Sequence, residues 1–207
     1  MNSRKKRLPL LTSLILMLVI SIPAYAQSRE KPLIIGADNN YPPFEFIDQN
    51  GELSGFNIEL IREIAREMGM EIQIKSGIWS TLRQEFDDGK IDILSGMFYS
   101  ESRLQTYAFS IPHSIISYAY FVHNDSDAVI SEEQLKTKRI ACQNNDIIHE
   151  YYKALGFDVF GENSPREALI GLARGHYDCC VVSKVVGLYY LRELKLKSIR
   201  ITGNPFF

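Results

Sequence analysis

The sequence lacks the signatures of several protein classes. Three cysteines among 207 residues are too few for a disulfide-rich domain, and no glycine-rich phosphate loop of the P-loop type occurs. The four histidines, at positions 113, 123, 149 and 176, do not have the spacing of metal ligands. We therefore expect no metal ion and no cofactor. Only one hydrophobic run is long, and it lies at the amino terminus.

The amino terminus has the three-part pattern of a secretory signal peptide. Residues 1–7 carry four basic side chains, residues 8–22 are almost wholly apolar, and Ala24-Tyr25-Ala26 ends the stretch with small residues at alternate positions. The apolar run of 15 residues is shorter than the roughly 20 that span a bilayer. We predict cleavage after Ala26 and a periplasmic product. No cysteine follows the cleavage site, so a lipid anchor is not expected.

The charge balance argues against nucleic acid as a partner. The chain has 23 Lys and Arg against 25 Asp and Glu, and 45% of its residues are hydrophobic, as in an ordinary globular protein. Removing residues 1–26 takes away four basic residues, which leaves 19 against 25 acidic ones. A negative chain without a basic cluster binds nucleic acid poorly. A small-molecule ligand is the expected partner.

From residue 31 onward, short apolar runs alternate with amphipathic segments, which predicts an α/β fold with parallel strands. We expect two lobes of similar architecture, over 27–120 and 121–207, joined by a crossing strand at 117–122. Predicted strands cover 33–36, 71–75, 91–94, 139–142, 158–160, 177–182 and 198–201. Predicted helices cover 55–68, 80–86, 146–155, 165–173 and 184–194.

Local signals set several of these boundaries. Gly69 should end the helix over 55–68, whose expected apolar face consists of Phe56, Leu60, Ile61, Ile64, Ala65 and Met68. Ser164, Pro165 and Glu167 form a capping box before the helix over 165–173.

Two segments repeat one pattern, in support of two similar lobes. DGKIDIL at 88–94 matches RGHYDCC at 174–180. In each, a glycine is placed to end a helix with positive φ, and an aspartate lies at the start of an apolar strand.

The three cysteines, Cys142, Cys179 and Cys180, fall on strands that are predicted to be neighbours. They are either buried free thiols, or Cys142 forms a disulfide with one of the other two.

The most specific signal is an ordered set of motifs in the first half. It comprises GADNNYPPFEF at 36–46, NGELSGFNIEL at 50–60, GKIDILSGM at 89–97, SESR at 100–103 and FSIP at 109–112. The set resembles the extracytoplasmic solute-binding proteins of family 3, the polar amino acid receptors of ABC importers. The resemblance implies a periplasmic binding protein (Venus-flytrap) fold of type II, with two α/β lobes that close on a small solute.

The resemblance also indicates ligand-binding residues. Pro42-Pro43 would hold Asp38 and Tyr41 at the carboxyl end of the first strand, where open α/β sheets bind ligands. In the family, the arginine matching Arg103 holds the ligand carboxylate through a two-pronged pair. The remaining matches to pocket-lining positions are Trp79, Ser95, Met97 and Phe98.

Three departures from the amino acid receptors disfavour an ordinary α-amino acid as ligand. Phe98 replaces a small hydroxyl residue, and Asn145-Asp146 replaces a Gly-Thr turn, so that Asp146 would cap the following helix and repel a carboxylate. Ser183, next to Lys184, stands where an aspartate usually receives the ligand amino group. We include all five residues among the candidate ligand contacts and expect a small polar or anionic solute.

Other segments resemble flytrap modules of sensor histidine kinases and diguanylate cyclases. They are MFYS at 97–100, PHS at 112–114, DIIHEY at 146–151 and KVVGLY at 184–189. We predict non-catalytic solute binding, in an ABC import system or a membrane-bound kinase or cyclase. The alternatives are a cyclohexadienyl dehydratase-like enzyme, with Asp38 or Glu45 as general acid, and the non-catalytic part of a lytic transglycosylase.

The family resemblance also gives an expectation about length. Residues 27–207 must supply both lobes, and the chain ends where it should cross back to the first lobe. We expect a truncated flytrap that lacks the second crossover and the carboxyl-terminal helices, roughly 40 to 50 residues.

Overall fold

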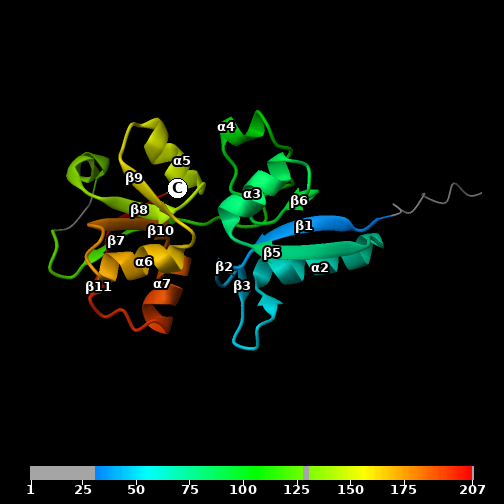
Figure 1. Cartoon of the computed structure of the whole chain (residues 1–207), viewed down its shortest axis with the longest axis horizontal. Coiled ribbons are helices and arrows are strands. Elements are labelled where there is room, and N and C mark those ends of the chain that lie inside the picture. Colours follow the sequence, from blue (N-terminus) through cyan, green and yellow to red (C-terminus); the bar gives the residue numbers. More distant parts are fainter. Residues whose placement is uncertain (1–30, 128–130, 207) are drawn as a thin grey trace, which may run out of the picture. The chain divides into compact units, whose positions relative to one another are not determined.

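The computed structural model describes residues 31–127 and 131–206, and these form two α/β lobes (Figure 1). The predicted signal peptide lies outside the described residues. The amino-terminal lobe contains a three-stranded parallel sheet in the order β5-β1-β6 and a small antiparallel sheet in the order β2-β3-β4. Its strands are β1 (Leu33–Asp38), β2 (Asn40–Tyr41), β3 (Glu45–Ile47), β4 (Leu53–Ser54), β5 (Ile72–Gly77) and β6 (Ile93–Leu94). Its helices are α2 (Phe56–Met68), α3 (Trp79–Asp87) and α4 (Glu101–Leu104).

The carboxyl-terminal lobe contains one five-stranded sheet in the order β11-β7-β10-β8-β9. Its strands are β7 (Tyr118–His123), β8 (Ile140–Gln143), β9 (Val159–Glu162), β10 (Cys179–Ser183) and β11 (Ile199–Phe206). Strands β10, β8 and β9 run parallel, whereas β7 is antiparallel to both β10 and β11. The helices are η1 (Glu132–Thr137), α5 (Ile147–Ala154), α6 (Pro165–Ala173) and α7 (Lys184–Glu193).

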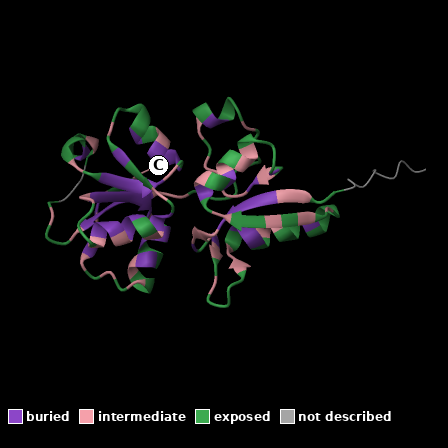
Figure 2. Ribbon diagram, in the orientation of Figure 1, coloured by how far each residue is buried: buried purple, intermediate pink, exposed green. Residues whose placement is uncertain are grey.

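Strand β7 shows why this lobe has the larger core. Its side chains alternate between the two faces of the sheet: Tyr118 and Tyr120 pack with α5 residues, and Ala119 and Phe121 pack with α6 and α7 residues. Both faces are therefore covered, and the central strands are buried along their length (Figure 2). Burial on both faces explains the continuous apolar run in the sequence.

The predicted architecture is confirmed, and most elements lie within two or three residues of their predicted bounds. Helix α6 covers the predicted residues, and Ser164 Oγ accepts a hydrogen bond from the Glu167 N–H. Sequence analysis missed β2, β3, β4 and η1, which are all short. The division into lobes at residue 120 stays a prediction, although the pairing of β7 with β10 places Tyr118–Tyr120 in the five-stranded sheet.

The repeated motif has the same role in each lobe. Gly89 and Gly175 both have positive φ, of 70° and 76°. Asp92 then accepts a hydrogen bond from the Ile34 N–H at 2.9 Å, and Asp178 accepts one from the Arg139 N–H at 2.8 Å. Each aspartate thus joins the start of its own strand to the start of the neighbouring strand.

Helix α2 differs from the prediction in which side chains it buries. Ile58 and Ala65 are buried, but Phe56 and Met68 of the expected apolar face are 50% and 66% exposed. The helix contacts β3 and β4, and this packing leaves Phe56 and Met68 largely in solvent. Its carboxyl end follows the prediction, since Gly69 is left-handed and its N–H bonds to the last turn.

The three cysteines are free and buried, so no disulfide joins Cys142 to Cys179 or Cys180. Cys142 and Cys179 lie on the α5 face of the sheet, whereas Cys180 lies on the opposite face. Burial raises the pKa of all three thiols. They act as small core residues, which is one of the two alternatives that the sequence left open.

Candidate functional site

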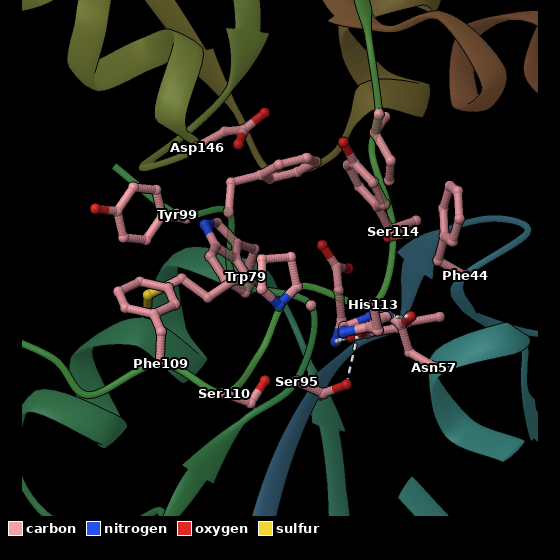
Figure 3. Close-up of a pocket in the computed structure, with 18 of the residues that line it drawn as sticks. Phe44, Asn57, Trp79, Ser95, Tyr99, Phe109, Ser110, His113, Ser114 and Asp146 are labelled. Carbon is pink, nitrogen blue, oxygen red and sulfur yellow. Dashed lines mark hydrogen bonds between the residues drawn. The ribbon is translucent and has the colours of Figure 1, made fainter. Parts of the chain in front are cut away.

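A cavity of about 410 Å³ is lined by residues from both lobes. Figure 3 shows Asp146 entering it from the helix that follows β8, opposite Trp79, Ser95 and Asn57 of the amino-terminal lobe. The lining is largely aromatic and aliphatic, with carboxyl, amide and hydroxyl groups among the rings. Its residues are Asp38, Tyr41, Phe44, Glu45, Asn57, Trp79, Ser95, Gly96, Met97, Phe98, Tyr99, Leu104, Phe109, Ser110, Ile111, Pro112, His113, Ser114, Ile116, Gln143 and Asp146.

The floor of the cavity is organised around the buried carboxyl group of Glu45. One oxygen accepts the Asp38 N–H at 2.7 Å, and the other accepts Asn57 Nδ2 at 2.6 Å and Ser95 Oγ at 2.8 Å. Gly96 has φ 69°, and a Cβ at this position would overlap Glu45 Oε1. Glycine is therefore required for this close approach. The Glu45 network fixes the end of β1 and the loop after β6 in one position.

Asp38 connects the two lobes. It is the last residue of β1, and its Oδ1 accepts the Asn40 N–H at 2.8 Å. Its Oδ2 accepts Gln143 Nε2 of the carboxyl-terminal lobe at 2.6 Å. Burial is the main cause that raises the pKa of Asp38 to about 7; the nearby Glu45 and Asp146 act in the same direction, and the hydrogen bonds from Gln143 and Asn40 act against it. The pKa of Glu45 is also raised, again by burial.

Asp146 caps α5, as the sequence predicts. Its Oδ1 accepts the Ile147 N–H at 2.6 Å, and its Oδ2 accepts the Tyr118 hydroxyl at 2.8 Å. Burial raises the pKa of this carboxyl group, while hydrogen bonds and the charge of Arg103 act in the other direction. The amino end of α5 thus already holds an acidic side chain where an anionic ligand group would otherwise be received.

Aromatic side chains form the walls. The ring of Phe98 lies 6.3 Å from that of Tyr41 and 5.6 Å from that of Tyr118. Burial raises the pKa of Tyr41 well above its usual value. Neither the Tyr41 hydroxyl nor Ser183 Oγ has a partner at hydrogen-bonding geometry in the described structure. Tyr41 lines the cavity, so its hydroxyl group adds a polar contact to an aromatic surface, which suits a ligand with an apolar body and a few polar groups.

Arg103 is buried, at 3% exposure, but it is not among the lining residues. Its Nε donates to Glu150 Oε2 at 2.9 Å, and its Nη2 donates to the Asn145 carbonyl at 3.2 Å. Asn145 has φ 59°, and its carbonyl also accepts Trp79 Nε1 at 2.9 Å. These contacts hold α3 and α4 of one lobe against the start of α5 in the other.

The structure brings seven of the eleven predicted ligand-binding residues to the cavity: Asp38, Tyr41, Trp79, Ser95, Met97, Phe98 and Asp146. Arg103 and Asn145 lie beside it in the contacts between lobes, whereas Ser183 and Lys184 do not line it. Ser183 is 1% exposed at the start of α7, and the Lys184 N–H donates to the Ser117 carbonyl. A ligand contact by any of the eleven stays a prediction.

Sequence reasoning missed several lining residues, and two of them had a usable signal. Gln143 is the last residue of β8, as Asp38 is of β1, so both lie at the carboxyl ends of strands. Asn57 lies in a motif that the family resemblance already singled out. His113 lies in the PHS motif at 112–114, which supports the resemblance to sensor modules but did not indicate a place in the cavity; its Nε2 is 3.2 Å from Asn57 Oδ1.

Within residues 31–127 and 131–206, no group of three or more His, Cys, Asp or Glu side chains is placed to hold a metal ion. In the same part of the chain, no helix combines the length and hydrophobicity that crossing a bilayer requires.

Known proteins with similar sequences include an amino-acid ABC transporter-binding protein and an L-cystine-binding protein. The probable amino-acid ABC transporter-binding protein of Haemophilus influenzae is 23% identical over 174 residues, which are 84% of this chain and 68% of that protein. The L-cystine-binding protein TcyJ of Escherichia coli is 25% identical over 178 residues, 84% of this chain and 66% of that protein.

Solved structures give the same fold. A histidine kinase sensor domain with similarity to periplasmic binding proteins has a TM-score of 0.82 and 36% identity, over 86% of this chain and 79% of that one. Arginine-bound ArgBP from T. maritima, truncated to residues 20–233, has a TM-score of 0.75 and 30% identity, over 84% and 83%. The description of bacterial extracellular solute-binding proteins, family 3, matches residues 33–155. The chain belongs to this family.

Proposed function

We propose that this protein binds a small polar solute in the cavity between its lobes, without chemical conversion. The observation that carries the proposal is the cavity of about 410 Å³, whose walls come from both lobes in a chain of the family 3 solute-binding proteins. A ligand that touches both lobes stabilises the closed arrangement by its differential affinity for it. Binding is thereby converted into a change of conformation.

The same change of conformation serves either of two systems. Relatives named as ABC transporter-binding proteins support delivery of the solute to an importer, and the similar histidine kinase sensor domain supports a signalling role. The motifs at 97–100, 112–114, 146–151 and 184–189 are those that resemble the sensor modules. We therefore place a sensor role, with a membrane-bound kinase or cyclase as partner, before transport.

The family is extracellular, and the location we propose is the periplasm. The basic, apolar and small-residue regions of the first 26 residues support export and removal of a signal peptide after Ala26. Amino-terminal sequencing of the exported protein should begin at Gln27.

One observation favours an enzyme as the second candidate. A general acid in a cleft needs a raised pKa, and burial raises the pKa of Asp38 to about 7 and that of Glu45 above its usual value. Both carboxyl groups are nevertheless bonded to backbone or side-chain donors on each oxygen. These bonds support a positioning role. Formation of phenylpyruvate from prephenate by the purified protein would establish the enzyme instead.

A thermal-shift screen of amino acids, amines and organic acids tests the proposed binding. A solute at a hundred times its dissociation constant adds about 2.7 kcal/mol, which raises Tm by about 5 to 10 °C in a protein of this size. Phe98→Ala removes a ring from the cavity wall and should weaken the response to the same solute by about tenfold or more in concentration.

The matched control is Phe160→Ala, which removes a ring from β9, outside the cavity lining. This variant should keep the response of the unmodified protein to the solute. Absence of a stabilising compound, or an equal loss in both variants, would count against the cavity as the binding site.

A further inference from the structure

Two arginines and one glutamate form a partly buried ion cluster next to the cavity, in which Arg103 is the buried member. Glu150 of α5 lies between them: its Oε2 is 2.9 Å from Arg103 Nε and its Oε1 is 3.2 Å from Arg83 Nη1. Arg103 belongs to α4 and Arg83 to α3, so both guanidinium groups come from the amino-terminal lobe. Glu150 therefore supplies, from the opposite lobe, the anion that the two arginines share.

The cluster leaves Arg103 no unused nitrogen. Besides the bond from Nε to Glu150, its Nη1 donates to the Phe98 carbonyl at 3.0 Å and its Nη2 to the Asn145 carbonyl at 3.2 Å. A guanidinium group binds a ligand carboxylate strongly when two of its N–H groups point to it. These bonds use one N–H of each Arg103 nitrogen, and those from Nε and Nη2 join the lobes, so a ligand carboxylate that took their place would compete with Glu150 and Asn145.

The cavity itself carries acidic groups. Asp38, Glu45 and Asp146 line it, and none of the described lining residues is a lysine or an arginine. An ammonium or guanidinium group would be attracted by these carboxyl groups in their ionised form, which its own charge favours, and by the faces of Tyr41, Trp79 and Phe98. A carboxylate would meet the same carboxyl groups without a cation to balance it, so its desolvation would not be compensated.

We propose that Glu150 determines the charge class of the solute, by occupying Arg103 and Arg83 as a built-in anion and reserving the cavity for organic amines without a carboxylate. The inference rests on the proposed function and specifies its ligand. The sequence predicted a solute that is either polar or anionic. The proposed role of Glu150 excludes the anionic solute and indicates a polar solute with a positive charge. Glu150 acts through the arginines and is a specificity-determining residue.

L-arginine and agmatine provide a direct test, because they differ only in the α-carboxylate. Thermal-shift titrations of each compound up to 10 mM give a ratio of apparent affinities for every variant. The unmodified protein should prefer agmatine by about tenfold or more. Glu150→Gln keeps the size of the side chain and frees the arginine charge, so it should shift the ratio toward L-arginine by about tenfold.

Two further variants connect the shift to the ion cluster. Adding Arg103→Ala to Glu150→Gln should abolish the gain for L-arginine. Glu133→Gln, which removes an equal charge from an exposed position paired with Lys136, should leave the ratio unchanged. Glu150→Asp draws the carboxylate back by one methylene and provides a second measurement if Glu150→Gln does not fold.

Preference of the unmodified protein for L-arginine, or an unchanged ratio in the folded Glu150 variants, would overturn the inference. Failure of agmatine to stabilise any variant would also overturn it. The proposed function would still be supported if a different solute from the screen stabilised the protein and this effect were weakened by Phe98→Ala. The proposed function and the inference about Glu150 can therefore fail separately.

Discussion

At the scale of single residues, the cost of burying the Asp38 carboxyl group makes stability depend on pH. The unfolded chain has a pKa near 3.8, whereas burial raises the pKa in the folded protein to about 7. The folded state therefore holds the proton more tightly. Its contribution to stability is fully present below pH 3.8 and is lost as the pH rises toward and through 7.

We expect Asp38→Asn to remove much of this pH dependence. The difference between the two pKa values corresponds to about 4 kcal/mol. The free energy of unfolding of the variant should therefore exceed that of the unmodified protein by up to a few kcal/mol at pH 8, and by little at pH 4. An asparagine can still accept from the Asn40 N–H and bond to Gln143 if that amide turns over. Urea unfolding at pH 4 to 8 measures the effect.

Asp48→Asn is the control for Asp38→Asn, because Asp48 is a carboxyl group whose pKa is lowered by hydrogen bonds to the Glu52 and Asn50 N–H groups. This substitution should not increase the free energy of unfolding at pH 8. A free energy of unfolding that rises between pH 5 and 8 in the unmodified protein, and falls in Asp38→Asn, would contradict the assignment of the raised pKa.

Residues at strand ends could be predicted as site residues, and those that act across the lobes could not. Asp38 is the last residue of β1 and Tyr41 lies three residues later, at the end of the strand where parallel sheets bind ligands, and both line the cavity. Glu150 gave no such signal, because only the folded chain brings it to Arg103, 47 residues away in sequence. For the same reason the sequence assigned Arg103 to a ligand without indicating its partner in this chain.

At the scale of elements, α7 packs closely on β7 at one glycine. A Cβ on Gly187 would overlap the ring of Phe121, which is fully buried and cannot move aside. Alanine in a helix is favoured over glycine by about 1 kcal/mol, but overpacking a core usually costs about 1 to 3 kcal/mol. We expect Gly187→Ala to lower Tm by a few degrees, as measured by calorimetry.

Val185→Ala, at a 45% exposed position of the same helix, should change stability by no more than about 0.5 kcal/mol. A Gly187→Ala protein as stable as the unmodified one would show that α7 can move away from β7. The bounds of α7 could be predicted from its pattern, but this contact could not, because a glycine inside a helix does not indicate what lies opposite it.

The accuracy of the element predictions followed the amount of burial. β7, β10 and α6 lie in the larger core and follow their predicted bounds closely, since burial on both faces leaves a strong apolar pattern. α2 has the same pattern in sequence, yet Phe56 and Met68 of its expected apolar face are exposed. Periodicity shows that a helix has an apolar face without showing which neighbour covers it.

At the scale of the whole molecule, a second contact between lobes should affect solute binding without touching the cavity. The Tyr190 hydroxyl of α7 donates to Asn40 Oδ1 at 2.6 Å and lies 3.1 Å from the Asn40 carbonyl, at β2 of the other lobe. Neither residue lines the cavity. A bond made only when the lobes meet raises the closed population, and the apparent affinity of a solute scales with that population.

Tyr190→Phe removes this hydroxyl group and keeps the ring, and a neutral hydrogen bond contributes about 1 kcal/mol. We therefore expect the apparent dissociation constant of a cavity-binding solute to rise by about fivefold in isothermal titration calorimetry. Tyr189→Phe makes the same chemical change one residue away, at a 37% exposed position, and should leave the constant unchanged. Equal constants for the two variants would show that the Tyr190 contact does not contribute to closure.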